Sequence, residues 1–424
     1  MRKYRIIIFT AFIFELGLLT FLRGIAGPYV SPLLLLAFSL IIGIYPLYIN
    51  NDPAILLKSK RKPLPLFYKL FVIVSVITIL TIATVFILDS LYKSHPIDPK
   101  ISTIIPTIQI MTQRFLNFEF PYKVISNWGT LQPSFMPFQW MPFLLGDLLK
   151  IDYRWIAFIF WLLGILFYSY RLLKKNVSVL NLILLAMLPF AVLFIYIRYV
   201  PETFVSNIEL LITGFYMILS LSLLSNSMFF RVSGIVLTLL SRFANVLWIP
   251  LNIAITYFAE KKQRAIILTG SIILAVILFY MLPFLSQNIL IFQQGQKYKT
   301  KAAIEEWKIK EPGRFGEKPS LLFNGVGVAC FFYEFKAGDL TRKVKALQKL
   351  HLIISILSIL VLAIIFLIYQ EIIDHKMFNL LSLKIHLAIV FNFFQVPHVY
   401  LFLVPIFVSV IILSEIISID KKTT

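Results

Sequence analysis

The run FYKLFVIVSVITILTIATVFILDSL (Phe67–Leu91) decides the class of fold that this sequence predicts. It is charged only at Lys69 and Asp89, and it exceeds the roughly 20 residues that a helix needs to cross a bilayer. Comparable apolar runs recur along the whole chain, and each is a predicted membrane span. The spans are Ile6–Leu22, Val30–Ile49, Phe67–Leu91, Trp155–Leu173, Ser178–Ile197, Ile208–Asn226, Ala265–Phe284, Leu350–Tyr369, Leu380–Phe394 and Val399–Ile417. The sequence therefore predicts an all-α, polytopic membrane protein with about 10–12 membrane segments.

The composition agrees with this class. Of the 424 residues, 59% are hydrophobic and 14% are charged, which is more apolar surface than a soluble domain can cover. The net charge of +20 would suggest nucleic acid in a soluble chain. In a membrane protein the cytoplasmic loops collect Lys and Arg, so we expect membrane lipid and no nucleic acid as a partner. We expect a multi-pass protein of the cell membrane, inner or plasma.

Basic clusters at short connections orient the chain with its N-terminus in the cytoplasm. These clusters are Arg2/Lys3/Arg5, Lys58/Lys60/Arg61/Lys62, Lys174/Lys175, Lys261/Lys262/Arg264 and Lys421/Lys422. Two long loops then lie outside, Tyr92–Arg154 and Leu285–Lys349. The expected organisation is two additional spans in 1–66, a transmembrane core in 67–284 with the outer loop 92–154, a second large loop in 285–349, and C-terminal spans in 350–424.

The segment Val232–Ala259 has basic residues beyond both of its ends, so both ends are expected in the cytoplasm. Two short helices that meet near Ser241–Asn245 would return the chain to its starting face, provided that the polar tip is buried in protein or faces a cavity. The alternative is one long tilted helix, which would move loop 285–349 into the cytoplasm. The 12 Lys/Arg against 6 Asp/Glu in that loop favour this alternative. Long loops translocate largely regardless of charge, however, and we prefer the hairpin.

The first long loop predicts a structured layer at the outer membrane surface. Ile101–Asn117 has apolar residues at helical spacing and is too short to span, so it is expected to lie flat in the interface. Pro133, Pro137 and Pro142 alternate with aromatic residues and are expected to prevent a regular helix up to Pro142. Met141–Lys150 then predicts a second short interfacial helix.

Two stretches of this loop, FLNFEFPY (Phe115–Tyr122) and LQPSFMPFQWMPFLLGDLLKIDYRW (Leu131–Trp155), follow a span and a juxtamembrane helix. In this arrangement the chain resembles the GT-C superfamily of membrane glycosyltransferases, and it is most similar to bacterial, mannosyltransferase-like members. The close resemblance covers Ile101–Trp155. It is looser in LLSRFANVLWIPL (Leu239–Leu251) and FFQVPHVYLFLVP (Phe393–Pro405).

The resemblance implies transfer of a sugar from a polyprenyl-phosphate-linked donor to a glycan, lipid or protein acceptor on the outer face. It also implies an acidic general base in the first outer loop and basic groups near the membrane that hold the lipid phosphate. The acid is expected near Ser102–Thr103, and this sequence has none there. Asp98 is the candidate in its place, and Asp89 is the second.

Further substrate-binding candidates are Arg198 with Glu202, Arg242, Asp147, Trp128 and His398. For Arg198 and Glu202 the sequence allows two interpretations, a phosphate-binding site or an ordinary ion pair at the membrane interface. Arg242 lies inside a hydrophobic segment, where an ionisable group is costly and indicates function. Asp147 is a candidate for binding the acceptor, whereas for Asp152 and Arg154 we favour mutual pairing.

His398 and Trp128 also have non-functional interpretations. His398 is explained equally as a structural histidine at the end of a span, and Trp128 as part of an aromatic belt at the membrane surface. The histidines show no zinc-binding spacing, so no metal ligand is assigned and dependence on a divalent metal stays open. In loop 285–349, Lys297, Lys299 and Lys301 followed by Glu305 and Glu306 predict a solvated, charged helix.

Two other classes of function stay open. One is a transporter or lipid flippase, for which the interrupted segment Val232–Ala259 is the only sign, without a matching partner in the other half of the chain. The other is a catalytically silent component of envelope assembly, which the missing acid at Ser102–Thr103 leaves open.

Overall fold

The computed structural model describes residues 2–50, 64–313 and 316–417, so the basic clusters at Lys58–Lys62 and Lys421/Lys422 lie outside the described residues. Seven helices in the described ranges are long and apolar enough to cross a bilayer. They are Arg23–Leu47 within α2 (Arg23–Asn50), α3 (Leu66–Ser94), α7 (Tyr153–Leu173), α8 (Val179–Tyr199), α13 (Lys262–Val276) continued by the π-helix η3 (Ile277–Leu285), α16 (Leu340–Tyr369), and η4 (Val399–Phe402) with α18 (Leu403–Ile417). The predicted all-α, multi-pass membrane fold is confirmed.

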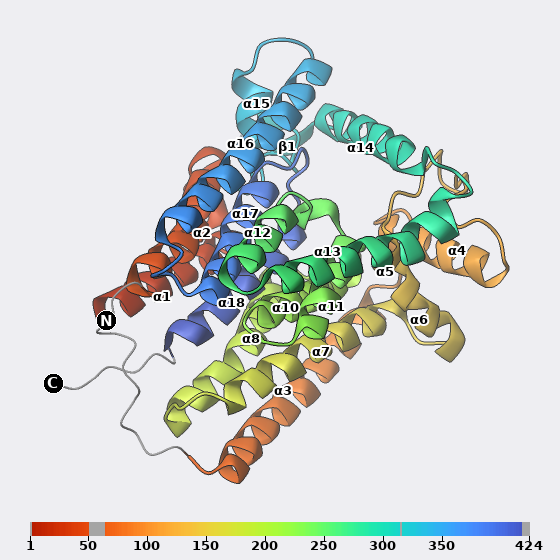
Figure 1. Ribbon diagram of the computed structural model, residues 1–424. Coiled ribbons are helices and arrows are strands. Elements are labelled where there is room, and N and C mark those ends of the chain that lie inside the picture. Colours follow the sequence, from red (N-terminus) through yellow and green to blue (C-terminus); the bar gives the residue numbers. More distant parts are fainter. Residues whose placement is uncertain (1, 51–63, 314–315, 418–424) are drawn as a thin grey trace.

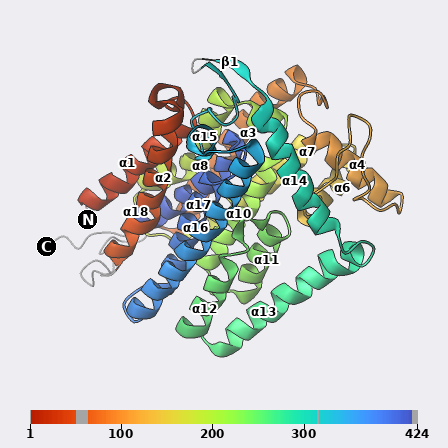
Figure 2. The ribbon, with the colours of Figure 1, turned by 90° about the horizontal axis from the view of Figure 1, so that it is seen from above.

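The shorter apolar helices α1 (Arg2–Leu19), α10 (Glu209–Leu223) and α17 (His375–Asn392) match the other predicted spans. Every residue of α10 is buried, as is α17 from Met377 onward. By contrast, α3 and α16 keep most of their apolar surface exposed, as expected for lipid-facing helices. Figure 2 shows α10 and α17 inside the bundle and α13 at its edge. The centre of the protein is therefore built by helices that are buried all round.

Glycine lets α10 lie directly against α7. A Cβ atom on Gly214 would lie 2.3 Å from the carbonyl oxygen of Phe160, and one on Gly164 would lie 3.1 Å from Cβ of Met217. Small residues at such crossings let two backbones approach closely, which is how membrane helices gain packing energy. This contact positions α10, whose first turn carries Glu209.

We therefore expect Gly214→Leu to destabilise the protein by about 1–3 kcal/mol or more, because the new side chain overlaps the backbone of α7. The measurement is the unfolding midpoint of the purified protein in detergent. Gly270→Leu is the matched control, since Gly270 is exposed on α13 with nothing within 4 Å of its Cβ position. Equal midpoints for the two variants would contradict the close packing of α7 and α10.

The predicted hairpin in Val232–Ala259 is confirmed. Helices α11 (Met228–Leu239) and α12 (Ile249–Ala259) are joined by the turn η2 (Phe243–Asn245). Arg231 at the start of α11 lies 2.6 Å from Glu260, which follows α12, so both ends lie on the same side. The tip is buried in protein: the carbonyl of Ala244 is 2.8 Å from His386 Nε2.

The first long loop contains the amphipathic helix α4 (Ile104–Leu116), followed by α5 (Pro137–Trp140), η1 (Met141–Phe143) and α6 (Leu144–Leu149). Both short helices predicted for this loop are present. The expectation that prolines prevent helix up to Pro142 is wrong for α5, because Pro137 occupies its first turn, where the missing N–H costs little. A short helix, α9 (Glu202–Val205), follows α8.

The second loop contains α14 (Ile291–Lys308), the antiparallel strands β1 (Glu311–Gly313) and β2 (Gly316–Lys318), and α15 (Ala329–Phe335). The two loops form one layer at the same end of the bundle (Figure 1). Phe284, at the end of η3, lies 5.3 Å from the ring of Tyr122 and 5.7 Å from that of Trp140. The described basic clusters Lys174/Lys175 and Lys261–Arg264 lie at those ends of α7 and α13 that point away from the two loops. This is the arrangement that the hairpin prediction requires.

A buried polar cluster attaches α1 and α2 to the rest of the bundle. Lys384 in α17 donates to Glu15 Oε1 at 2.5 Å and to Ser39 Oγ at 3.2 Å, and Ser409 donates to Glu15 Oε2 at 2.8 Å. Lys384 is 0% exposed and Glu15 is 1% exposed. Each charge is therefore paired inside the membrane region, where an unpaired charge would be very costly.

Candidate functional site

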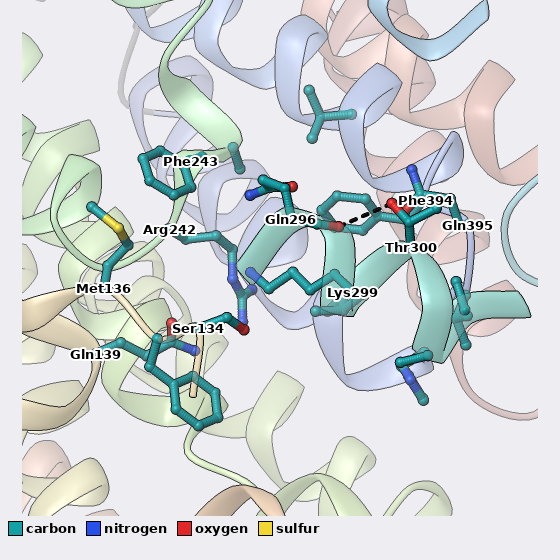
Figure 3. Close-up of a pocket in the computed structure, with 18 of the residues that line it drawn as sticks. Ser134, Met136, Gln139, Arg242, Phe243, Gln296, Lys299, Thr300, Phe394 and Gln395 are labelled. Atoms are coloured by element: carbon teal, nitrogen blue, oxygen red, sulfur yellow. Dashed lines mark hydrogen bonds between the residues drawn. The ribbon is translucent and has the colours of Figure 1, made fainter. Parts of the chain in front are cut away.

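A cavity of about 710 Å³ lies beneath the layer of loops. Its walls come from the first loop, the hairpin tip around η2, one face of α14, the part of α16 between Gln348 and Ser355, and the segment that leads into η4 (Figure 3). This volume is typical of sites that enclose a small ligand. Since these segments are far apart in the sequence, the tertiary structure alone creates the cavity.

Arg242, at the hairpin tip, extends into this cavity and forms a two-pronged ion pair with Glu209. Nη1 lies 2.7 Å from Oε1 and Nη2 lies 2.8 Å from Oε2. The Glu209 side chain is 2% exposed and that of Arg242 is 16% exposed. The pair is therefore nearly dry, and the remaining N–H groups of Arg242 are available to an anion.

One face of α14 forms the opposite wall. Gln296, Lys299, Ala303 and Glu306 follow each other at spacings of three or four residues, which places them on one side of a helix. Figure 3 shows Lys299 reaching toward the guanidinium group of Arg242, with Ser134 beside them. Two cations thus face the same space, and only Arg242 has a carboxylate partner among the described residues.

The environment of Lys299 lowers its pKa to about 8, because the surrounding protein removes water and, as a smaller effect, Arg242 adds a positive charge nearby. The side chain is accessible from the cavity, so a ligand can reach it. A bound anion would relieve both effects, since it would pair the ammonium group and offset the charge of Arg242.

Glu306 lies two turns further along the same face of α14. Burial, followed by the nearby charge of Glu311, raises the pKa of its carboxyl group. Within the described ranges its carboxylate has no ion-pair partner. Of the two carboxylates that line the cavity, Glu306 is therefore the more accessible, since Arg242 already holds both oxygens of Glu209.

The remainder of the cavity is lined largely by uncharged polar and aromatic side chains. The side-chain amides of Gln139, Gln296 and Gln395 make no hydrogen bond to any described residue. The rings of Phe394 and Tyr400 also line the space. Free amides can donate and accept at once, and aromatic faces accept C–H groups, so the lining suits a polyhydroxylated ligand.

Of the candidates named from the sequence, Arg242 and His398 line this cavity. Asp98, the first candidate for the general base, does not line this cavity and lies instead at a separate hollow of about 40 Å³. Its carboxylate accepts from the backbone N–H of Lys100 at 2.9 Å. Asp89 forms a surface ion pair with Lys93 at 2.6 Å. Neither aspartate is placed to act on a ligand between Arg242 and Lys299.

The remaining candidates also lie outside the cavity. Arg198 and Glu202 are exposed and form no ion pair with each other among the described residues. Asp147 accepts from the Tyr153 hydroxyl at 2.6 Å, a structural link between α6 and α7. Trp128 is half-buried in an irregular part of the first loop, between Asn127 and Gly129.

The structural role favoured for Asp152 and Arg154 is confirmed. Asp152 accepts from the backbone N–H of Arg154 and so caps α7. The Arg154 side chain pairs with Asp152 at 2.6 Å and donates to the carbonyl of His95 at 2.6 Å. It therefore ties the start of α7 to the end of α3.

Lys299, Glu306 and Glu209 were not predicted as site residues from the sequence. The charged segment of loop 285–349 is helical, as predicted, but one of its faces, with Lys299 and Glu306, lines the cavity. The available signal was the seven-residue separation of Lys299 and Glu306, which places both on one face of a helix. Within the described ranges, no group of three or more His, Cys, Asp or Glu residues is arranged to hold a metal ion.

These features define a multi-pass helical membrane protein with a ligand-sized cavity, lined by both polar and apolar side chains, beneath the loops at one end of its bundle. No family model, curated protein or solved structure matches the chain.

Proposed function

We propose that the protein is a membrane glycosyltransferase that moves a sugar from a polyprenyl-phosphate-linked donor to an acceptor hydroxyl at the outer face of the cell membrane. One observation carries the proposal. A single cavity combines two cations, a carboxylate of raised pKa that has no ion-pair partner among the described residues, and a lining of side-chain amides and aromatic rings. These are the groups that a lipid-linked sugar phosphate and its reaction require.

Lys299 and Arg242 would hold the donor phosphate. Arg242 is oriented by Glu209 at 2.7 Å, which leaves Lys299 as the cation without a protein partner in the described part of the cavity. The phosphate gains negative charge as the sugar leaves it, so cations placed at this point stabilise the transition state more than the ground state.

Glu306 would act as the general base. Its carboxylate takes the proton of the acceptor hydroxyl while the acceptor oxygen bonds to the anomeric carbon of the sugar. The bond between that carbon and the phosphate oxygen breaks, and its electron pair stays on the lipid phosphate beside Lys299 and Arg242. Seven residues of α14 separate Lys299 from Glu306, which corresponds to about 10 Å along the helix and leaves room for a sugar ring.

The polyprenyl chain would leave the cavity on its apolar side. Phe292 and Leu352 line the cavity and keep 45% and 52% of their surfaces exposed. Leu352 belongs to α16, whose apolar surface faces outward over most of its length. A lipid chain lying there would stay in contact with hydrocarbon while its phosphate reaches Lys299.

The direct test is reconstitution of the protein in vesicles with a radiolabelled polyprenyl-phosphate sugar and a mixture of candidate acceptors. Release of polyprenyl phosphate together with a labelled product supports the proposal. Movement of intact donor between leaflets without release would indicate a flippase instead. Donor that is neither cleaved nor moved, in the presence of membrane extracts that contain acceptor, would favour a catalytically silent component.

The pH dependence gives a second test. Lys299 binds phosphate only as a cation, and its pKa is lowered to about 8, so affinity should fall as the pH rises through that value. Glu306 must be deprotonated, so activity should also fall at acid pH, below its raised pKa. We expect Lys299→Arg to keep phosphate binding above pH 8, because a guanidinium stays charged. The measurement is the affinity for polyprenyl phosphate as a function of pH. If the affinity of the variant falls above pH 8 as it does in the wild type, the prediction is wrong.

A further inference from the structure

Four exposed lysines form what we call the lysine strip: Lys297 and Lys301 in α14, and Lys345 and Lys349 in α16. In each pair the residues are four apart and share one helix face. The helices meet where Gln348 donates to the Thr300 hydroxyl at 3.1 Å. Since Lys301 follows Thr300 and Lys349 follows Gln348, the two pairs flank the same crossing.

The strip carries an excess of positive charge. Two other lysines of the second loop pair with carboxylates, Lys308 with Glu305 at 2.9 Å and Lys318 with Glu334 at 2.8 Å. Glu305 shares the face of Lys297 and Lys301 but pairs with Lys308 instead. None of the four strip lysines has a carboxylate partner in the described part of the chain. Like charges on one surface repel each other, and an anion that lies against the strip relieves this repulsion.

The helices place the strip at the edge of the hydrocarbon layer. Lys349 precedes the apolar part of α16, where Leu352 is 52% exposed, so its Cα lies about 5 Å along the helix from lipid-facing surface. On the other side, Ile289 is 81% and Leu290 50% exposed immediately before α14 begins. The phosphates of membrane lipids lie at this level.

We propose that the lysine strip binds the headgroups of anionic phospholipids in the surrounding leaflet. The occupant follows from the depth of the strip and from its charge, and it does not depend on the proposed sugar transfer. Lys297 and Lys301 lie on the side of α14 opposite to Lys299, so these headgroups are distinct from any ligand in the cavity. Bound headgroups also hold α14 against the bundle, where its other face closes the cavity.

The test is selective lipid retention by the full-length protein. The protein is purified from vesicles of equal amounts of phosphatidylglycerol and phosphatidylcholine, and the retained lipids are counted by native mass spectrometry. We expect a preference for phosphatidylglycerol that the variant K297Q/K301Q/K345Q/K349Q loses, by about fivefold in affinity for each lysine near the anionic surface. The matched control replaces the exposed Lys100, Lys150, Lys310 and Lys336 by Gln. It changes net charge equally and should keep the preference.

Three outcomes would overturn the proposal. One is an unchanged preference in the strip variant. The second is an equal loss in the control, which would mean that net charge alone attracts the lipid. The third is a wild-type protein that shows no lipid preference yet binds soluble polyphosphate through the strip, which would make the partner a polyanion from the aqueous phase. Unfolding midpoints equal to that of the wild type establish that both variants are folded.

Discussion

Glu306→Gln is expected to reduce sugar transfer by about 10²–10⁴-fold at neutral pH, which is the usual contribution of a general base. Gln keeps the size of the side chain and its place on α14, but its amide cannot take a proton from the acceptor. Donor binding should change little, since Lys299 and Arg242 remain. The measurement combines the transfer rate with a separate binding assay for polyprenyl phosphate.

Two matched variants make this result specific. Glu305→Gln removes the neighbouring carboxylate, which is exposed and paired with Lys308 at 2.9 Å, and should leave transfer unchanged. Asp98→Asn tests the base expected from the family resemblance, and it should also retain activity because Asp98 lies outside the cavity. If Asp98→Asn abolishes transfer while Glu306→Gln does not, the assignment of the base is wrong although the glycosyltransferase proposal stands.

Lys384→Met is expected to destabilise the protein by about 3–5 kcal/mol, the usual cost of leaving one charge of a buried pair without its partner. The variant leaves Glu15 at 1% exposure with only hydroxyl donors, from Ser39 and Ser409. The unfolding midpoint in detergent measures the loss. Because Glu15 lies in α1 and Lys384 in α17, the first effect should be release of the two N-terminal helices, seen as faster proteolysis before Leu66.

The double variant Glu15→Gln/Lys384→Met separates charge from packing. It removes both charges while largely keeping side-chain volume, so it should recover much of the stability that Lys384→Met loses. A double variant as unstable as Lys384→Met would mean that the shape of the cluster, and not its charge balance, holds α1 and α2 in place.

The sequence predicted the membrane class, the outer-loop helices and the hairpin because each depends on local quantities. Apolar length identifies a span, the spacing of apolar residues identifies α4, and basic residues beyond both ends of Val232–Ala259 require that segment to turn back. The same local signals could not separate a central helix from a lipid-facing one. The runs that became α3 and α10 are both strongly apolar, yet α10 is fully buried and α3 is mostly exposed.

The candidate site was predicted only in part, for a related reason. Arg242 could be found because an isolated charge in an apolar segment is costly wherever that segment lies. Lys299 could not be found in this way. Closely spaced charges in a loop predict a solvated helix, and only the tertiary structure shows which face of that helix packs against the rest of the protein. Asp98 was favoured because it is close in sequence to the position where the family resemblance implies an acid, and the fold places it beside a different hollow.

The sequence by itself determined that this chain crosses the membrane many times, and it favoured without deciding that both long loops lie at the end opposite to the basic clusters. The tertiary structure alone decided where the cavity is. Gly295 lets α14 approach Ser134, where a Cβ atom would lie 3.0 Å from the Ser134 Cβ, and Trp307 donates to the carbonyl of Gln395 at 2.8 Å. These contacts fold α14 back over the hairpin tip and bring Lys299 to Arg242. No local pattern encodes them, because they join residues that are far apart in the chain.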